Sequence, residues 1–184
     1  LYYTGPLDGL LQDNWHQDRS HCIPCTLSLD RGRRALLLED GSGTPLSVDA
    51  AFPVLHGKNG EDGTVQGLLE LAGIPLIGCG TLASALCMDK DRSHKLAALA
   101  GIQVPKGTVH SRGTPEAVLL ASAREIGYPL FVKPVRSGSS FGVTRVEREA
   151  ALLPAVEEAF LHDDDVILEE AIPGFEVGCA VLGN

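Results

Sequence analysis

The fold is decided by the stretch Leu130-Phe131-Val132-Lys133-Pro134-Val135-Arg136-Ser137-Gly138-Ser139-Ser140-Phe141-Gly142. Residues 130–134 are typical of a strand, residues 137–142 form a loop of glycine and serine, and Val143–Val146 is the next strand. This order excludes a Walker A loop and a Rossmann fingerprint, because both require a helix after the glycines. Glycines allow a close approach to a ligand, and successive backbone N–H groups can hold an anion. The loop is therefore either a phosphate lid or a plain hairpin connection.

Several charged side chains lie close to this hairpin or end a nearby strand. Lys133 sits in an apolar strand four residues before the loop, which favours a phosphate partner over an amine that only reaches solvent. Lys90 follows a predicted helix break, and by itself it is typical of a surface lysine. Glu169 and Glu170 end a strand on opposite faces, so that one carboxylate can face a pocket. Glu176 follows a turn and suits either ribose hydroxyls or solvent.

The elements around the hairpin predict a small α+β unit over residues 90–178. A helical stretch from Leu82 to Ala100, broken near Met88-Asp89, precedes an extended segment over Ile102–Val109 that is an edge strand or a linker. The other predicted elements are helices over 114–127 and Glu149–Leu161 and a strand over Val166–Glu170. Pro154 lies inside the second of these helices, where only the first turn tolerates a proline.

The first half of the chain predicts a βαβ unit and hence a parallel sheet. Val48–Leu55 is typical of a buried strand, the apolar positions of Val65–Ala72 repeat with helical spacing, and Ile74–Ile77 is a second strand. His56 lies at the carboxyl end of the first strand, where ligands bind in open α/β sheets. It either orients a substrate carboxylate or caps the strand.

The composition is that of a globular protein, with 184 residues of which 44% are hydrophobic and 21% are charged. The net charge of −9 argues against nucleic acid or an anionic membrane as a partner, because phosphate contacts require clustered lysine and arginine. No apolar run approaches the ~20 residues that span a bilayer, and no secretory signal is visible. We expect both ends to be cut, because Leu1 is not methionine and the chain stops abruptly at Asn184.

The five cysteines are an odd number spread along the chain, which predicts reduced thiols and a cytoplasmic protein. Cys22-Ile23-Pro24-Cys25, next to His21, could indicate zinc or a redox pair. A zinc site needs a second pair of ligands and a thioredoxin-like site needs a following helix, and neither is present in the sequence. We therefore interpret Cys22 and Cys25 as ordinary loop thiols and assign no metal ligands.

Together these segments resemble the D-alanine–D-alanine ligase family of ATP-grasp enzymes, from about Val48 to Asn184. Residues 136–142 and 175–183 are similar to the glycopeptide (vancomycin) resistance branch, and residues 57–60 and 88–96 to its D-alanine–D-serine members. The motifs that carry the family resemblance are Leu55-His56-Gly57, Gly60-Glu61-Asp62-Gly63, Gln66-Gly67, Glu70-Leu71, Ser84-Ala85-Leu86, Met88-Asp89-Lys90, Val132-Lys133-Pro134, Gly138–Val143 and Leu168-Glu169-Glu170.

The resemblance implies a role for each matching residue. Lys90 and Lys133 would contact the phosphates of ATP, and Ser139 and Ser140 would belong to the lid over them, with Ser139 and His56 as the catalytic candidates. His56 would lie near the D-amino-acid substrates. The implied nucleotide-base contacts are Glu169 on the adenine amino group, the backbone of Glu170, Ala171 and Ile172 along the adenine edge, and Glu176 on the ribose.

The resemblance also implies an α/β fold with three parts. Residues 1–88 would be a partial, parallel-sheet N-terminal (pre-ATP-grasp) domain, residues 89–178 the small α+β central domain of an ATP-grasp fold, and residues 179–184 the start of a C-terminal ATP-grasp domain that is otherwise missing. The family's first strand, with its substrate-binding glutamate, has no counterpart here. Neither have its catalytic arginine and the ligands for Mg²⁺.

The implied activity is ATP-dependent ligation of D-alanine to D-alanine, D-serine or D-lactate through an acyl phosphate, which makes the end of a peptidoglycan precursor. The resemblance further implies a cytoplasmic homodimer with small-molecule substrates, while this chain alone is expected to be inactive. The sequence leaves the second substrate open. It also leaves three alternatives open: another ATP-grasp carboxylate–amine ligase, a nucleotide-binding module without catalysis, or a structural α/β domain without a ligand.

Overall fold

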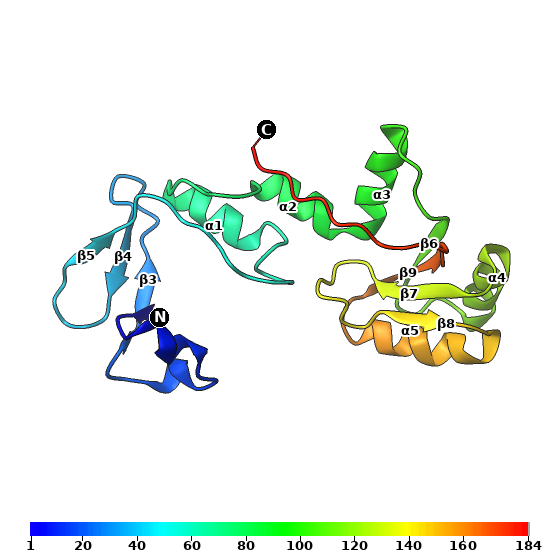
Figure 1. Cartoon of the computed structure of the whole chain (residues 1–184), viewed down its shortest axis with the longest axis horizontal. Coiled ribbons are helices and arrows are strands. Elements are labelled where there is room, and N and C mark those ends of the chain that lie inside the picture. Colours follow the sequence, from blue (N-terminus) through cyan, green and yellow to red (C-terminus); the bar gives the residue numbers. More distant parts are fainter. Residues whose placement is uncertain (184) are drawn as a thin grey trace. The chain divides into compact units, whose positions relative to one another are not determined.

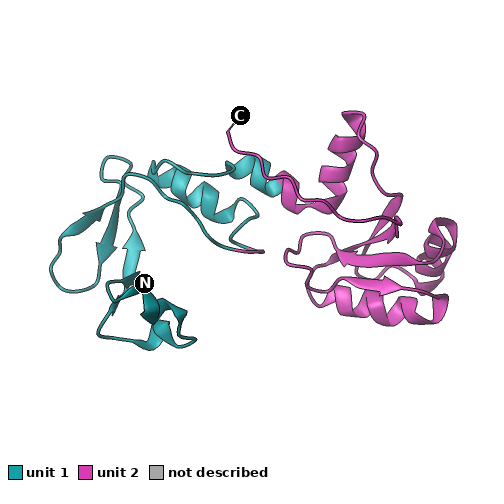
Figure 2. Ribbon diagram, viewed as in Figure 1, with its two compact units in different colours: residues 1–55, 59–85 teal, residues 56–58, 86–184 magenta. Residues whose placement is uncertain are grey.

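The computed structural model describes residues 1–183, which fold as two compact units (Figure 2). Unit 1 comprises residues 1–55 and 59–85, and unit 2 comprises residues 56–58 and 86–184. Each unit has its own hydrophobic core. The domain limits at residues 88 and 178 remain predictions, and the last predicted segment, 179–184, ends on Asn184, which lies outside the described residues.

Unit 2 is built on a four-stranded antiparallel sheet in the order β6-β9-β7-β8 (Figure 1). These strands are β6 (Gly107–Ser111), β9 (Asp165–Glu170), β7 (Leu130–Pro134) and β8 (Thr144–Val146). Helices α4 (Glu116–Ile126) and α5 (Leu152–Phe160) pack on the sheet and share its core. The predicted α+β unit is confirmed. Of the extended segment predicted over Ile102–Val109, only residues 107–109 belong to the edge strand β6, and Pro105 precedes it.

The two faces of this sheet differ because side chains alternate along each strand. Leu130 and Val132 of β7 are fully buried among the helices, together with Leu168 of β9. Phe131 and Lys133 point to the opposite face, which lacks those helices. The register pairs Phe131 with Glu169 and Lys133 with Ile167, so Glu169 projects from this same face.

The helix boundaries in unit 2 follow from local chemistry. Asp89 separates α2 (Thr81–Met88) from α3 (Lys90–Leu99) and caps α3, because its side chain accepts the N–H of Arg92 at 2.9 Å. The predicted break at Met88-Asp89 is thus confirmed. Residues 149–151 form a short 3-10 helix, η3, so α5 begins only at Leu152. Pro154 then lies in the first turn, where its missing N–H has no helical acceptor.

Unit 1 contains two small antiparallel sheets at its start. The first pairs β1 (Tyr2–Tyr3) with β2 (Cys22–Ile23), and the second has the order β3 (Cys25–Leu27), β4 (Ala35–Leu38), β5 (Pro45–Ser47). Short 3-10 helices, η1 (Leu7–Leu11) and η2 (Trp15–Gln17), connect β1 to β2. Helix α1 (Thr64–Ala72) ends at Gly73, a left-handed cap with φ of 70°.

The predicted βαβ unit of unit 1 is present in a reduced form. A single parallel bridge joins Ala51 to Leu76, with hydrogen bonds of 2.8 Å and 2.9 Å, and α1 packs over it. The prediction that Val48–Leu55 is a buried strand is wrong at its end, because Phe52, Val54 and Leu55 are exposed. The backbone there has no neighbouring strand within residues 1–183, so neither a ladder nor a second layer covers these side chains.

Candidate functional site

The face of the unit 2 sheet opposite α4 and α5 carries an ion pair between Lys133 of β7 and Glu169 of β9. The two residues are diagonal neighbours in the antiparallel register, and Lys133 Nζ donates to Glu169 Oε1 at 2.6 Å. The Lys133 ammonium also lies 5.1 Å from the ring centroid of Phe131, within the range of a cation–π contact. The strand pairing therefore positions a lysine and a glutamate together in the interior, as a lysine in an apolar strand requires.

The Glu169 carboxylate is buried but only half satisfied. The residue is 4% exposed, and its second oxygen, Oε2, accepts no hydrogen bond from residues 1–183. The His94 ring of α3 lies nearby, with its Nδ1 3.8 Å from Oε2, beyond hydrogen-bond reach. A buried oxygen without a donor is costly, so Oε2 is suited to a donor from a bound molecule.

Lys90, the first residue of α3, directs its ammonium to the chain that leaves β7. Its Nζ donates to the carbonyl oxygens of Pro134 at 2.9 Å and Ser137 at 2.7 Å. Burial lowers the pKa of Lys90, and the positive charge of Lys133 lowers it further, against an opposing effect of Glu169 among other carboxylates. Two mutually repelling ammonium groups at the root of the Ser/Gly loop form an environment that favours an anion.

The Ser/Gly loop, residues 137–142, keeps its tip exposed. Ser139 and Ser140 both have positive φ, 50° and 57°, which is uncommon for residues with a side chain. Their backbone N–H groups donate no hydrogen bond within residues 1–183. The loop is closed by weak turns, from Phe141 N–H to Gly138 O at 3.2 Å and from Val143 N–H to Ser140 O at 3.3 Å. Free donors at an exposed tip are what a phosphate lid requires.

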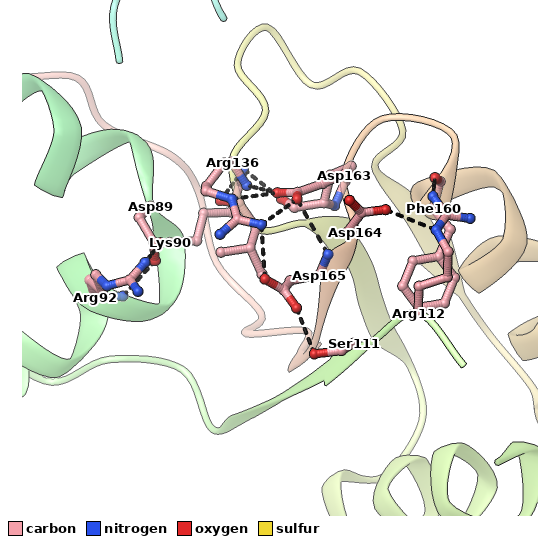
Figure 3. Close-up of polar contacts among 12 residues, drawn as sticks. Asp89, Lys90, Arg92, Ser111, Arg112, Arg136, Phe160, Asp163, Asp164 and Asp165 are labelled. Carbon is pink, nitrogen blue, oxygen red and sulfur yellow. Dashed lines mark hydrogen bonds and ion pairs between the residues drawn. The ribbon is translucent and has the colours of Figure 1, made fainter. Parts of the chain in front are cut away.

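The base of the loop is held by a cluster of opposite charges (Figure 3). Arg136 Nη2 donates to Asp163 Oδ1 at 2.6 Å and to Asp165 Oδ2 at 2.8 Å, and the Arg136 backbone N–H donates to Asp163 Oδ2 at 2.6 Å. Burial would raise the pKa of Asp163, but the hydrogen bonds from Arg136 outweigh it and lower that pKa below its ordinary value. The charged pair is therefore maintained at neutral pH.

The structure brings some of the sequence-predicted residues together and leaves others apart. Lys90, Lys133 and Glu169 form one cluster at the root of the loop that carries Ser139 and Ser140. Glu170 is on the opposite face of β9, where Oε1 accepts the N–H of Lys106 at 2.9 Å. Ala171 donates its N–H to Pro129 O at 3.3 Å, whereas Ile172, Glu176 and His56 are exposed and no hydrogen bond or ion pair described for residues 1–183 involves them.

Sequence reasoning missed three residues of this region. His94 lies four residues after Lys90, on the same side of the helix, and this spacing was a signal that the sequence already contained. Arg136 and Asp163 are 27 residues apart, so no local pattern connected them. The acidic run Asp163-Asp164-Asp165 was a visible signal, but a charge run is more often solvated than paired.

No metal centre is present in the part of the chain that the structure describes. Residues 1–183 contain no group of three or more histidine, cysteine, aspartate or glutamate side chains arranged to hold an ion. All five cysteines are free thiols, with Cys22 buried and its Sγ donating to Trp15 O at 3.2 Å. None of the helices in this range has the length and apolarity needed to cross a membrane.

Comparison with known proteins matches the chain to two family models. Residues 11–79 match the model described as D-ala D-ala ligase N-terminus, and residues 97–184 match the model described as D-ala D-ala ligase C-terminus. The two matches occur in the order in which they occur in that family. They cover the unit 1 segments around α1 and the whole sheet of unit 2.

Individual relatives agree with this match. A D-alanine–D-alanine ligase of Caldicellulosiruptor bescii is 46% identical over all of this chain and 51% of its own length. The vancomycin B-type resistance protein VanB of Enterococcus faecalis is 47% identical over 92% of this chain and 48% of its own length. The crystal structure of the VanG D-Ala:D-Ser ligase from Enterococcus faecalis superposes with a TM-score of 0.84 and 51% identity, over 94% of this chain and 50% of that one. The chain spans about half the length of these relatives, and it belongs to the D-alanine–D-alanine ligase family.

Proposed function

We propose that the face of the unit 2 sheet opposite α4 and α5 binds ATP, with Glu169 as the residue that recognises the base. The observation that carries this proposal is the buried Oε2 of Glu169, which lacks a donor within residues 1–183. An adenine amino group supplies a donor of the required kind. The backbone of Glu170, Ala171 and Ile172 continues from Glu169 and would follow the adenine edge, and Glu176 would accept from the ribose hydroxyls.

The phosphates would lie between the two lysines and the Ser/Gly loop. An ammonium group has three donors, and Lys133 uses one of them on Glu169, which leaves donors for a phosphate oxygen. Lys90 donates to the carbonyl oxygens of Pro134 and Ser137 at 2.9 Å and 2.7 Å and to Val135 O at only 3.5 Å, so a phosphate oxygen would replace this long third bond. The free N–H groups and hydroxyls of Ser139 and Ser140 would close over the phosphates from the other side and exclude water.

For the whole protein we propose ATP-dependent ligation of D-alanine to a second D-amino or D-hydroxy acid, in the synthesis of a peptidoglycan precursor. Residues of this chain would bind and orient ATP, neutralise its charge and exclude water from an acyl phosphate. Ser139 and His56 would lie near the reacting carboxylate. Mg²⁺ would accompany ATP, and we assign none of its ligands to residues 1–183.

The proposed whole protein is a cytoplasmic homodimer of the vancomycin-resistance type. This placement is supported by the similarity to VanB and to the VanG D-Ala:D-Ser ligase. We expect the 184-residue chain by itself to bind nucleotide but to lack ligase activity. A coupled assay that detected D-alanine-dependent ADP release from this chain would contradict that expectation.

The binding site is tested by calorimetric titration of the 184-residue chain with ATP. Lys133→Ala should weaken binding about 10- to 100-fold, because a charge-assisted hydrogen bond contributes roughly 1.5–3 kcal/mol. Lys95→Ala is the matched control, since Lys95 also lies on α3 but is exposed and pairs only with Asp91. Equal affinities for the two variants would reject the proposed site.

The role of Glu169 requires a separate comparison. Glu169→Gln keeps the size of the side chain, but its amide nitrogen is a donor facing the adenine donor, so ATP should bind more weakly. The same variant should discriminate less between ATP and GTP, because the base contact is altered while the phosphate contacts remain. Unchanged preference for ATP over GTP would assign base recognition to another group.

A further inference from the structure

Both ends of the Ser/Gly loop rest on the short turn over residues 161–164, between α5 and β9, and on the first residue of β9, Asp165. At the start of the loop, Arg136 contacts Asp163 and Asp165 through its side chain and Asp163 through its backbone. At the end of the loop, a Cβ on Gly142 would lie 2.5 Å from the His162 ring, so only glycine fits there. The Phe141 ring also faces His162, with centroids 6.4 Å apart.

This turn is itself fixed to the edge strand of the sheet (Figure 3). Ser111 Oγ donates to Asp165 Oδ1 at 2.7 Å, and Arg112 Nε donates to Asp164 Oδ1 at 2.9 Å. The Arg112 guanidinium also bonds to Phe160 O at the end of α5. The turn is thus a rigid support between β6, β9 and α5, and the loop depends on it at both of its ends.

Asp163 is the centre of this support. Its side chain is 7% exposed, and its two oxygens accept from the Arg136 side chain, the Arg136 backbone and the Asp165 N–H. Nothing comparable holds the loop tip, because the backbone N–H groups of Ser139 and Ser140 have no acceptor within residues 1–183. The base of the loop is therefore held by ion pairs, whereas these tip N–H groups remain available as donors.

We propose that Arg136 and Asp163 are a positioning pair that aims the Ser/Gly loop at the nucleotide phosphates. The inference rests on the proposed function and deepens it by naming the residues that set the lid. Arg136 directs Nε and Nη2 to aspartates, and the Asp163 side chain is only 7% exposed, so the contacts of this pair hold the loop base rather than a ligand. Both act through the backbone that leads from β7 to Ser139.

A positioning role makes a selective prediction. A displaced lid loses contacts with phosphates, whereas the base contact at Glu169 is made by β9 and does not involve the loop. We therefore expect Arg136→Gln to weaken ADP binding roughly tenfold, as expected for lost charge-assisted contacts, and to leave adenosine binding within about twofold of wild type. Arg136→Lys keeps the charge and should recover part of the ADP affinity.

The experiment measures binding of ADP and of adenosine to the 184-residue chain by protein-observed NMR titration. Arg124→Gln is the matched control, because Arg124 forms a similar two-bond pair with Glu149, both at 2.6 Å, away from the loop. It should change neither affinity. If Arg136→Gln does not fold, Asp165→Asn removes one of the same contacts and must show the same selective loss.

The outcomes separate this inference from the function on which it rests. Wild-type ADP affinity in Arg136→Gln, or equal loss of ADP and adenosine, would overturn the positioning pair while the proposed ATP site stands. A wild-type chain that binds neither ligand would overturn the proposed function and this inference with it. Selective loss of ADP, absent in the Arg124 control, is the supporting result.

Discussion

Replacing Lys133 by methionine removes the charge from a buried ion pair while keeping most of the side-chain volume. Lys133 Nζ lies 2.6 Å from Glu169 Oε1, and the two side chains are 21% and 6% exposed. Because Glu169 Oε2 already lacks a donor within residues 1–183, the variant leaves both carboxylate oxygens unsatisfied. We expect a large loss of stability from a substitution that creates almost no cavity.

The magnitude can be bounded. Removing one partner of a buried pair costs about 3–5 kcal/mol. Because the Lys133 side chain is 21% exposed rather than fully covered, we expect a loss near the lower end of this range, about 3 kcal/mol.

Urea unfolding of the 184-residue chain at pH 7, followed by far-UV circular dichroism, measures this loss. At an m-value of about 2 kcal/mol/M the midpoint should fall by roughly 1.5 M at pH 7. Lys133→Met combined with Glu169→Leu should recover stability, because an apolar pair often replaces a buried ion pair without cost, yet it should not bind ATP. Wild-type stability in the single variant, or a double variant no more stable than the single one, would refute the reasoning.

Three further predictions concern the loop and its surroundings. Gly142→Ala should lower stability by about 1–3 kcal/mol in thermal unfolding, because a Cβ would meet His162 at 2.5 Å and φ is 70°; wild-type stability would contradict this. Asp163→Asn should destabilise the chain at neutral pH but not in strong acid, since hydrogen bonds from Arg136 lower the Asp163 pKa below 3.8 and the stability it contributes is lost as pH falls through that lowered value. If the stability loss of Asp163→Asn were the same at every pH in unfolding experiments, the charge of Asp163 would not be its cause. Because burial lowers the pKa of Lys90 below 10.5, ADP should bind with proton uptake in alkaline solution, measured by calorimetry in buffers of different ionisation enthalpy; no uptake at any alkaline pH would remove Lys90 from the phosphate site.

Local patterns predicted the elements of unit 2 well. The alternation in Leu130–Pro134, the loop glycines and the proline at position 105 indicated β7, its turn and the edge strand β6. The capping aspartate at position 89 marked a helix break, which the structure confirms. These signals are readable because each depends on residues only a few positions apart.

Local sequence patterns gave a wrong prediction where the burial of a segment depends on residues far away in the sequence. Val48–Leu55 has the apolar composition of an interior strand, but Phe52 and Val54, near the end of this segment, are exposed. Composition shows that a segment suits a core, whereas burial requires other segments to pack against it. The single parallel bridge at Ala51 is the part of the prediction that has such a neighbour.

By itself, the sequence determined the family, the order of the elements and the set of lysines and glutamates around the Ser/Gly loop, because motifs and periodicity are local properties. Only the tertiary structure decided the pairing. The antiparallel register of β7 and β9 joins Lys133 to Glu169, and the turn before β9 joins Asp163 to Arg136. The two residues of the first pair are 36 positions apart in the sequence, and those of the second pair are 27 positions apart. Hydrogen bonding between β7 and β9 brings them together, and no local sequence pattern indicates which strands pair.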